Sequence, residues 1–170
     1  MSIRRAVFAL ALSATGSFLC PIPATASDPM VPMQYLVGKW TCNGSFPASG
    51  KSIASTIRFD LDLGGAALVK HHDDLAPGSY HAIEVWVYQP DSKHYALTIT
   101  DNFGGIRGFT SDSWQAQTLT VQGNAAKPAE KFIYTNLSPD TMRVDWEIAR
   151  DGAHFVLGDT LACARERGPS

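Results

Sequence analysis

The chain has 170 residues, with 16 acidic and 14 basic side chains, a net charge of −2 and three cysteines. Two of the basic residues, Arg4 and Arg5, lie at the N-terminus, so the remainder of the chain carries a net charge near −4. The sequence contains no basic run or arginine cluster, which argues against nucleic acid or anionic lipid as a partner.

Residues 1–26 are predicted to be a secretory signal peptide. Arg4 and Arg5 are followed by an uncharged run over 6–19, and small residues at 24–26 form the expected cleavage site. The apolar run is about 14 residues long, shorter than the roughly 20 residues of a membrane-spanning helix. We therefore expect cleavage near Ala26, a secreted or periplasmic protein without a membrane span, and one domain over 27–170.

Two cysteines, Cys42 and Cys163, remain after the predicted cleavage. In an oxidising compartment this pair is most simply read as one disulfide, and the alternative is two unpaired buried thiols. The third cysteine, Cys20, raises the alternative of a lipoprotein anchor. Phe18 and Leu19 directly before it are larger than the small residues of such a site.

The rest of the chain is a series of short strands separated by turn residues, after one helical turn expected at 33–37. In the segment 53–63, for example, Ile57 and Phe59 alternate with Arg58 and Asp60, the period of a half-buried strand. Glycine, proline and aspartate turns separate the strands. The expected strands begin near residue 38 and then cover 53–63, 66–72, 81–88, 95–103, 106–114, 119–121, 132–136, 142–148 and 154–164.

This order predicts an all-β protein of about 8–10 antiparallel strands with short up-and-down connections. A closed barrel and a β-sandwich both satisfy it. Pairing Cys42 with Cys163 would bring the first strand beside the last, which favours the barrel because closure hides the sheet edges.

The segment Leu36-Val37-Gly38-Lys39-Trp40 resembles the opening of the calycin-type barrels, which include lipocalins and fatty-acid-binding proteins. The segments 40–42, 63–65 and 158–163 together are similar to an uncharacterised family of secreted bacterial calycin-like proteins. The resemblance implies that Trp40 closes one barrel end and that Gly38 permits a close turn there. It also implies a basic residue of the last strand over the tryptophan. Arg165 is the nearest candidate, and a solvent-exposed arginine is the alternative.

Nitrobindins share the ten-stranded version of this architecture and bind haem through a histidine near the chain end. His154 is the histidine in that region here. The residues around it do not match the nitrobindin pattern, so we expect no cofactor.

The most polar cluster is His71-His72-Asp73-Asp74. Strand alternation places His71 with Asp73 on one face and His72 with Asp74 on the other. Each pair has the atoms for a metal ligand set or a proton relay. The alternative, which we prefer, is a strand that runs into a solvated loop, so no metal site is predicted.

We expect the barrel to bind a small, mostly apolar ligand through Glu84, Trp86, Tyr95 and Asp101. Glu84 and Trp86 share one face of a strand, where the acid is either a pocket carboxylate or exposed to water. Asp101 precedes Phe103-Gly104-Gly105 and is alternatively a hairpin residue.

No catalytic residues are predicted, since the sequence contains no Gly-x-Ser-x-Gly motif and the paired cysteines would leave no thiol nucleophile. A barrel enzyme that uses enclosed carboxylates and histidines, such as a cyclase or isomerase, is the alternative to a binding protein. A cell-envelope interaction module with a filled core is the third. A filled interior would exclude both other functions, whereas a roomy cavity with Glu84 and a second titratable group would favour the enzyme.

Overall fold

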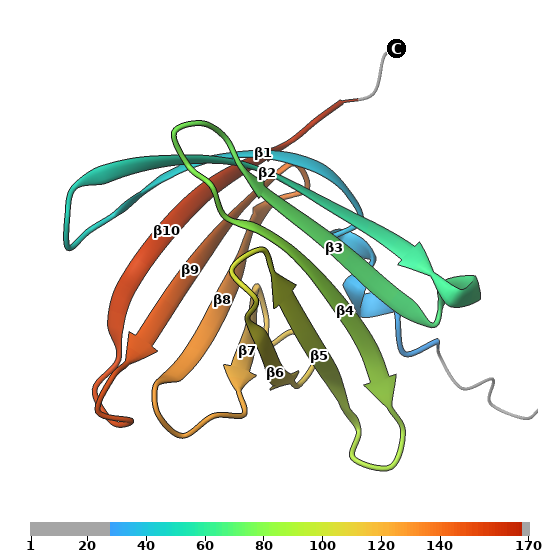
Figure 1. The fold of residues 1–170 in the computed structure, drawn as a ribbon. Helices are drawn as coiled ribbons and strands as arrows, with labels where there is room; N and C mark the ends of the chain where they lie inside the picture. The colour runs from blue at the N-terminus through green and yellow to red at the C-terminus, as the bar shows by residue number, and fades with distance from the viewer. Residues whose placement is uncertain (1–27, 168–170) are drawn as a thin grey trace, which may run out of the picture.

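The computed structural model of the protein describes residues 28–167 (Figure 1). Ten strands and two short 3-10 helices form a single barrel in this part of the chain. In chain order, the elements are η1 (Val31–Tyr35), β1 (Gly38–Phe46), β2 (Lys51–Asp62), η2 (Leu63–Gly65), β3 (Ala67–Asp74), β4 (His81–Gln89), β5 (His94–Asp101), β6 (Ile106–Ser111), β7 (Thr118–Gly123), β8 (Ala129–Ser138), β9 (Thr141–Ala149) and β10 (Val156–Arg165).

Each strand pairs antiparallel with the next, and β1 pairs antiparallel with β10, which closes the barrel. The predicted all-β, up-and-down barrel is therefore confirmed, and the alternative of a sandwich is excluded. The helical turn lies at 31–35, two residues before its predicted place, with Pro32 in its first turn. The strand predicted at 132–136 is longer, because β8 begins at Ala129.

Alternation along the strands separates the core from the surface, as the sequence pattern predicts. Ile57 and Phe59 of β2 are buried, whereas Arg58 and Asp60, which alternate with them, are exposed and form an ion pair at 2.9 Å. The pairing of β6 with β7 is short, since only Phe109 with Gly123 and Thr110 with Gln122 are in register. Between the ends of these two strands, the Ser111 hydroxyl donates a hydrogen bond of 2.6 Å to the Thr120 carbonyl.

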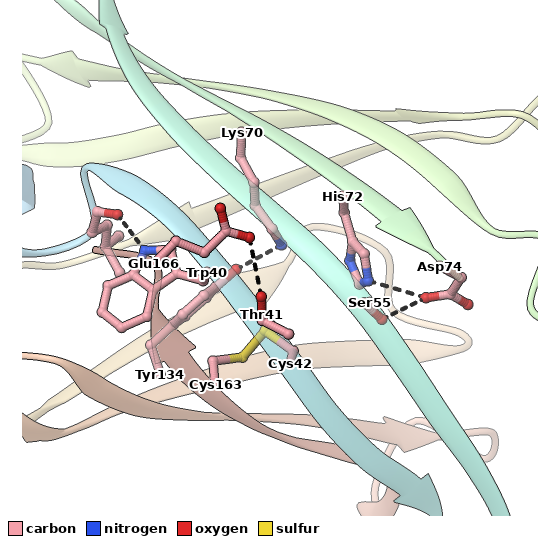
Figure 2. Close-up of a disulfide and its surroundings, with 11 residues drawn as sticks. Trp40, Thr41, Cys42, Ser55, Lys70, His72, Asp74, Tyr134, Cys163 and Glu166 are labelled. Carbon is pink, nitrogen blue, oxygen red and sulfur yellow. Dashed lines mark hydrogen bonds and ion pairs between the residues drawn. A yellow bond between two sulfur atoms is a disulfide. The ribbon is translucent and has the colours of Figure 1, made fainter. Parts of the chain in front are cut away.

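The predicted disulfide between Cys42 and Cys163 is present and joins β1 to β10 inside the barrel (Figure 2). The two cysteines are opposite each other in the strand register. Since the register runs from Trp40–Arg165 to Ser45–Thr160, the disulfide lies within the paired region of this junction.

Helix η1 covers one end of the barrel, beside the β2–β3 turn, and the β1–β2 hairpin lies at the opposite end (Figure 1). Trp40 is completely buried under η1, and its indole N–H donates to the Leu36 carbonyl at 2.8 Å. The guanidinium of Arg165 stacks 4.1 Å above the Trp40 ring and donates to the carbonyls of Val37 and Tyr35. This end is therefore closed by packed side chains and hydrogen bonds.

Gly38 begins β1 with φ of +123°, in the region that favours glycine. A Cβ at this position would lie 2.9 Å from Arg165 Nη1. No helix in residues 28–167 is both long and apolar enough to cross a membrane. The predicted signal peptide and Cys20 lie outside the described residues.

Candidate functional site

The candidate site is a cavity of about 220 Å³ in the half of the barrel away from η1. Its apolar wall comes from the first two and the last three strands and comprises Phe46, Ile53, Ile57, Phe132, Val144, Trp146 and Leu161. Its polar wall comprises Lys70, His72, Asp74, Tyr80, Glu84, Arg107 and Asp159. The interior is thus neither filled nor purely apolar.

The floor of the cavity is a buried ion pair between Lys70 of β3 and Glu84 of β4, which face each other in the strand register. Lys70 Nζ lies 2.6 Å from Glu84 Oε1 and donates to the Tyr134 hydroxyl at 3.0 Å. The other carboxylate oxygen, Oε2, accepts from the Trp86 indole at 3.1 Å. Both charged side chains are at most 4% exposed.

Burial alone would lower the pKa of Lys70, but the Glu84 carboxylate and the Tyr134 hydroxyl outweigh this and raise it above its ordinary value. The ammonium therefore remains protonated. Because every polar atom of the pair has a partner, Lys70 and Glu84 form a structural floor, and neither group is left free for proton transfer.

The inward half of the polar cluster at 71–74 lies on the cavity wall. Asp74 Oδ1 accepts from the Ser55 hydroxyl at 2.7 Å and lies 3.3 Å from His72 Nε2, although this second approach is not aligned for a hydrogen bond (Figure 2). Burial raises the pKa of Asp74, but His72 and Ser55 more than offset that effect, so the pKa lies below its ordinary value. Asp74 is therefore an anion near neutral pH.

The outward half of the same cluster points to the surface. Asp73 pairs with His81 at 2.8 Å, and both side chains are about half exposed. The predicted division of the cluster between two faces is thus observed. No group of three histidine, cysteine or acidic residues within 28–167 is arranged to hold a metal ion.

Asp159 of β10 is the least satisfied carboxyl group of the cavity. Within the described chain, no hydrogen-bond donor or cation lies in contact with it. Burial, together with the nearby Asp74 carboxylate, raises the pKa of Asp159 to about 7. Asp159 therefore exchanges its proton near neutral pH, where carboxyl groups are ordinarily ionised.

A β-bulge between Leu157 and Asp159 shifts the register of β10 against β9 directly before Asp159, which lines the cavity. Gly158 within the bulge accommodates the Trp146 indole, since a Cβ there would lie 2.3 Å from Trp146 Cε3. The absence of a side chain at Gly158 therefore allows Trp146 to form part of the cavity wall.

Arg107 of β6 supplies the second cation of the cavity. Its Nη1 lies 2.7 Å from Glu130 Oε2, and its Nη2 donates to the Tyr80 hydroxyl at 3.0 Å and lies 3.4 Å from Asp101 Oδ2. Two acids and a phenol therefore surround this guanidinium, which fixes it to the wall.

The structure does not bring the four predicted ligand residues together. Only Glu84 lines the cavity, and Trp86 lies beneath it as the indole donor. The Tyr95 hydroxyl donates to the Pro29 carbonyl at 2.5 Å, at the end covered by η1. Asp101 caps the β5–β6 hairpin by accepting from the backbone N–H groups of Phe103 and Gly105, which is the alternative its sequence context indicated.

Several cavity residues were not predicted from the sequence: Lys70, Tyr80, Arg107, Phe132, Trp146 and Asp159. Strand parity contained part of this information. Lys70 has the parity of Leu68 in its strand, Arg107 that of Phe109, and Asp159 that of Leu161, and these three apolar partners are buried.

A larger hollow of about 400 Å³ lies against the surface of β1, β2 and β3, next to outward-facing side chains such as Arg58, His71 and Asp73. It is more open and more polar than the barrel cavity. Small-molecule sites are typically concave and largely apolar, so we place the candidate site in the barrel interior.

Sequence comparison finds no matching protein family and no matching curated protein. Solved structures share the fold, among them the following two. The protein Rv2717c from M. tuberculosis matches with a TM-score of 0.63 and 14% identity over 84% of this chain and 100% of its own. The S-type phycobiliprotein lyase CPES from Guillardia theta matches with a TM-score of 0.52 and 12% identity over 80% of this chain and 91% of its own. At these identities the likeness is one of fold, a ten-stranded barrel of the calycin kind.

Proposed function

We propose that this is a secreted or periplasmic protein that binds a small, mostly apolar molecule in the barrel cavity. The observation that carries the proposal is the cavity itself, which is lined by seven apolar or aromatic side chains and seven polar ones, most of which are held by hydrogen bonds or ion pairs. Sites with this division bind the apolar body of a ligand by desolvation and orient it by a few polar contacts.

The size of the cavity limits the ligand. At about 220 Å³, it is smaller than the roughly 300–1,000 Å³ of sites for drug-sized molecules. A single ring with a short substituent is the appropriate scale, and a long fatty acyl chain is not. The disulfide and the predicted signal peptide support an oxidising compartment.

A cavity-filling substitution tests this proposal. Val144 of β9 is buried on the cavity wall, so Val144→Trp should fill the space. Val85→Trp is the matched control, because Val85 is 41% exposed on the outer face of β4. With 2-phenylethanol as a neutral probe, titration followed by ¹H–¹⁵N chemical shifts should show binding to the wild type and to V85W.

The V144W variant should bind the probe at least tenfold more weakly, while its spectrum remains that of a folded barrel. Equal binding by V144W and V85W would contradict an interior site. Native mass spectrometry of periplasm-purified protein addresses the natural ligand. We expect an adduct on the wild type that V144W lacks, and the mass of the bare oxidised chain in every preparation would count against a tightly retained ligand.

One observation also favours the second candidate, an enzyme on the same barrel. The cavity contains Glu84 together with another titratable group, Asp159, whose pKa of about 7 suits proton transfer near neutral pH. Since Glu84 is fully occupied by Lys70 and Trp86, Asp159 is the acid that would act. If the wild type converts the molecule that mass spectrometry identifies, and Asp159→Asn abolishes this conversion, the protein is an enzyme. Recovery of the unchanged molecule would identify a binding protein.

A further inference from the structure

The two cations of the cavity are already neutralised by the protein. Lys70 contacts Glu84 and Tyr134, and three aromatic rings lie within 6 Å of its Nζ. Arg107 contacts Glu130 at 2.7 Å and a second acid at 3.4 Å. A carboxylate or phosphate ligand at these two cations would compete with the acids, and a displaced acid would then be buried without a counterion. Arg107 Nε, which is buried and has no hydrogen-bond partner within the described residues, is the donor that remains open to such a ligand.

Two acids of the cavity wall, Asp74 and Asp159, have fewer hydrogen-bond partners than these cations. Asp74 accepts from the Ser55 hydroxyl and lies 3.3 Å from His72 Nε2, and its side chain is 8% exposed. Asp159 has no donor within residues 28–167. Carboxylates that are largely removed from water are normally paired or hydrogen-bonded, and the partly buried Asp159 has no such partner within the described chain.

Aromatic rings form the adjacent apolar wall. Phe46, Phe132 and Trp146 line the cavity that also contains Asp159. The faces of such rings attract a cation, most strongly where water is excluded. The unpaired acid and the aromatic wall therefore favour the same kind of ligand head group.

We propose that the ligand of this barrel is a small aromatic or apolar amine, with its ammonium group beside Asp159 and Asp74 and its apolar body against Phe132 and Trp146. This inference rests on the proposed function, because it names the ligand class of the same cavity. The ammonium would supply the positive partner that the described chain does not provide for Asp159.

Binding of an amine should be linked to release of a proton. The charges of Asp74 and Lys70 on β3 and of Asp145 on β9 act on Asp159, and His72 and Arg107 also line the cavity. Burial and Asp74 raise the pKa of Asp159 to about 7, whereas an ammonium beside it would favour the ionised form. The affinity for an amine should therefore rise with pH between about 5.5 and 8.5, as Asp159 loses its proton.

The test compares three probes with similar bodies: 2-phenylethylamine, 2-phenylethanol and 3-phenylpropionate. The amine remains protonated over this range, since an aliphatic ammonium has a pKa of about 10. By isothermal titration at pH 8, we expect the amine to bind about tenfold or more tightly than the alcohol, as for a charge-assisted hydrogen bond. The carboxylate should bind most weakly.

Asp159→Asn should remove the preference for the amine and flatten its pH dependence, while binding of the alcohol is unchanged. Asp145→Asn is the matched control, because it removes the same charge on β9 from a residue outside the cavity lining. It should retain the preference.

The outcomes separate this inference from the proposed function. If the alcohol binds and V144W abolishes its binding, the proposed function holds. Equal affinity for amine and alcohol, preference for the carboxylate, or an unchanged preference in D159N would then overturn the amine inference alone. If none of the three probes binds the wild type, both are overturned.

Discussion

At the scale of single residues, Asp159 has a pKa of about 7 instead of the ordinary 3.8. A carboxyl with a raised pKa binds its proton more tightly in the folded than in the unfolded protein. Its contribution to the free energy of unfolding is therefore most favourable below about pH 4 and is lost progressively as the pH rises to about 7.

Asp159→Asn should consequently stabilise the unliganded protein at pH 8 and leave its stability nearly unchanged at pH 4. The shift corresponds to at most about 4 kcal/mol, and we expect about 1–3 kcal/mol, because the carboxyl keeps some contact with water. Urea unfolding of the wild type and of D159N across this range measures the difference.

Asp60→Asn is the control for this measurement, since Asp60 is exposed on β2 and pairs with Arg58 at the surface. Its effect should be within about 0.5 kcal/mol at either pH. A stability difference between D159N and wild type that does not change with pH would contradict the assignment of the raised pKa to Asp159.

At the scale of elements, the shape of the cavity wall depends on the fit between β9 and β10. Because a Cβ at Gly158 would lie 2.3 Å from the Trp146 ring, Gly158→Ala should displace the indole and lower the free energy of unfolding by about 1–3 kcal/mol. It should also weaken binding of 2-phenylethanol, as Trp146 lines the cavity. Urea unfolding and probe titration of the variant measure the two effects.

A double-mutant cycle with Trp146→Val shows whether the clash is the cause. In the W146V background, Gly158→Ala should cost much less than in the wild type, because the ring that it meets is absent. An equal cost in both backgrounds would attribute the loss to the backbone of the bulge and contradict the role given to the ring.

The strands themselves were predictable, because strands with one buried face alternate apolar and polar residues along the sequence. Ile57 and Phe59 against Arg58 and Asp60 show this plainly, and β2 contains all four. The bulge before Asp159 was not predictable in the same way. A single extra residue changes the register without changing the composition of the strand.

At the scale of the whole molecule, the candidate site was predicted only in outline. Glu84 was identified because an acid among aromatic residues is unusual, but the side chains that complete its surroundings come from strands far apart in the sequence. Lys70 and Tyr134 are 64 residues apart and contact each other at 3.0 Å. Strand parity indicates which side chains point inward, whereas the level along the barrel axis at which they meet depends on the register of all ten strands.

The effect of the disulfide on stability also depends on the whole chain. Cys42 and Cys163 are 121 residues apart, so the bond restricts most of the unfolded chain but adds little to a β1–β10 junction that is already hydrogen-bonded in register. The double variant Cys42→Ala/Cys163→Ala should therefore keep the barrel, with an unchanged far-UV circular dichroism spectrum. Its free energy of unfolding should fall by about 2–5 kcal/mol.

Urea unfolding with and without dithiothreitol provides the control. The reductant should move the wild-type transition towards that of the double variant and leave the variant itself unaffected, since the variant has no bond to reduce. Loss of the barrel spectrum in the variant would mean that the disulfide holds the β1–β10 junction together in the folded state. An unchanged unfolding midpoint would mean that the ends of the unfolded chain are already close without it.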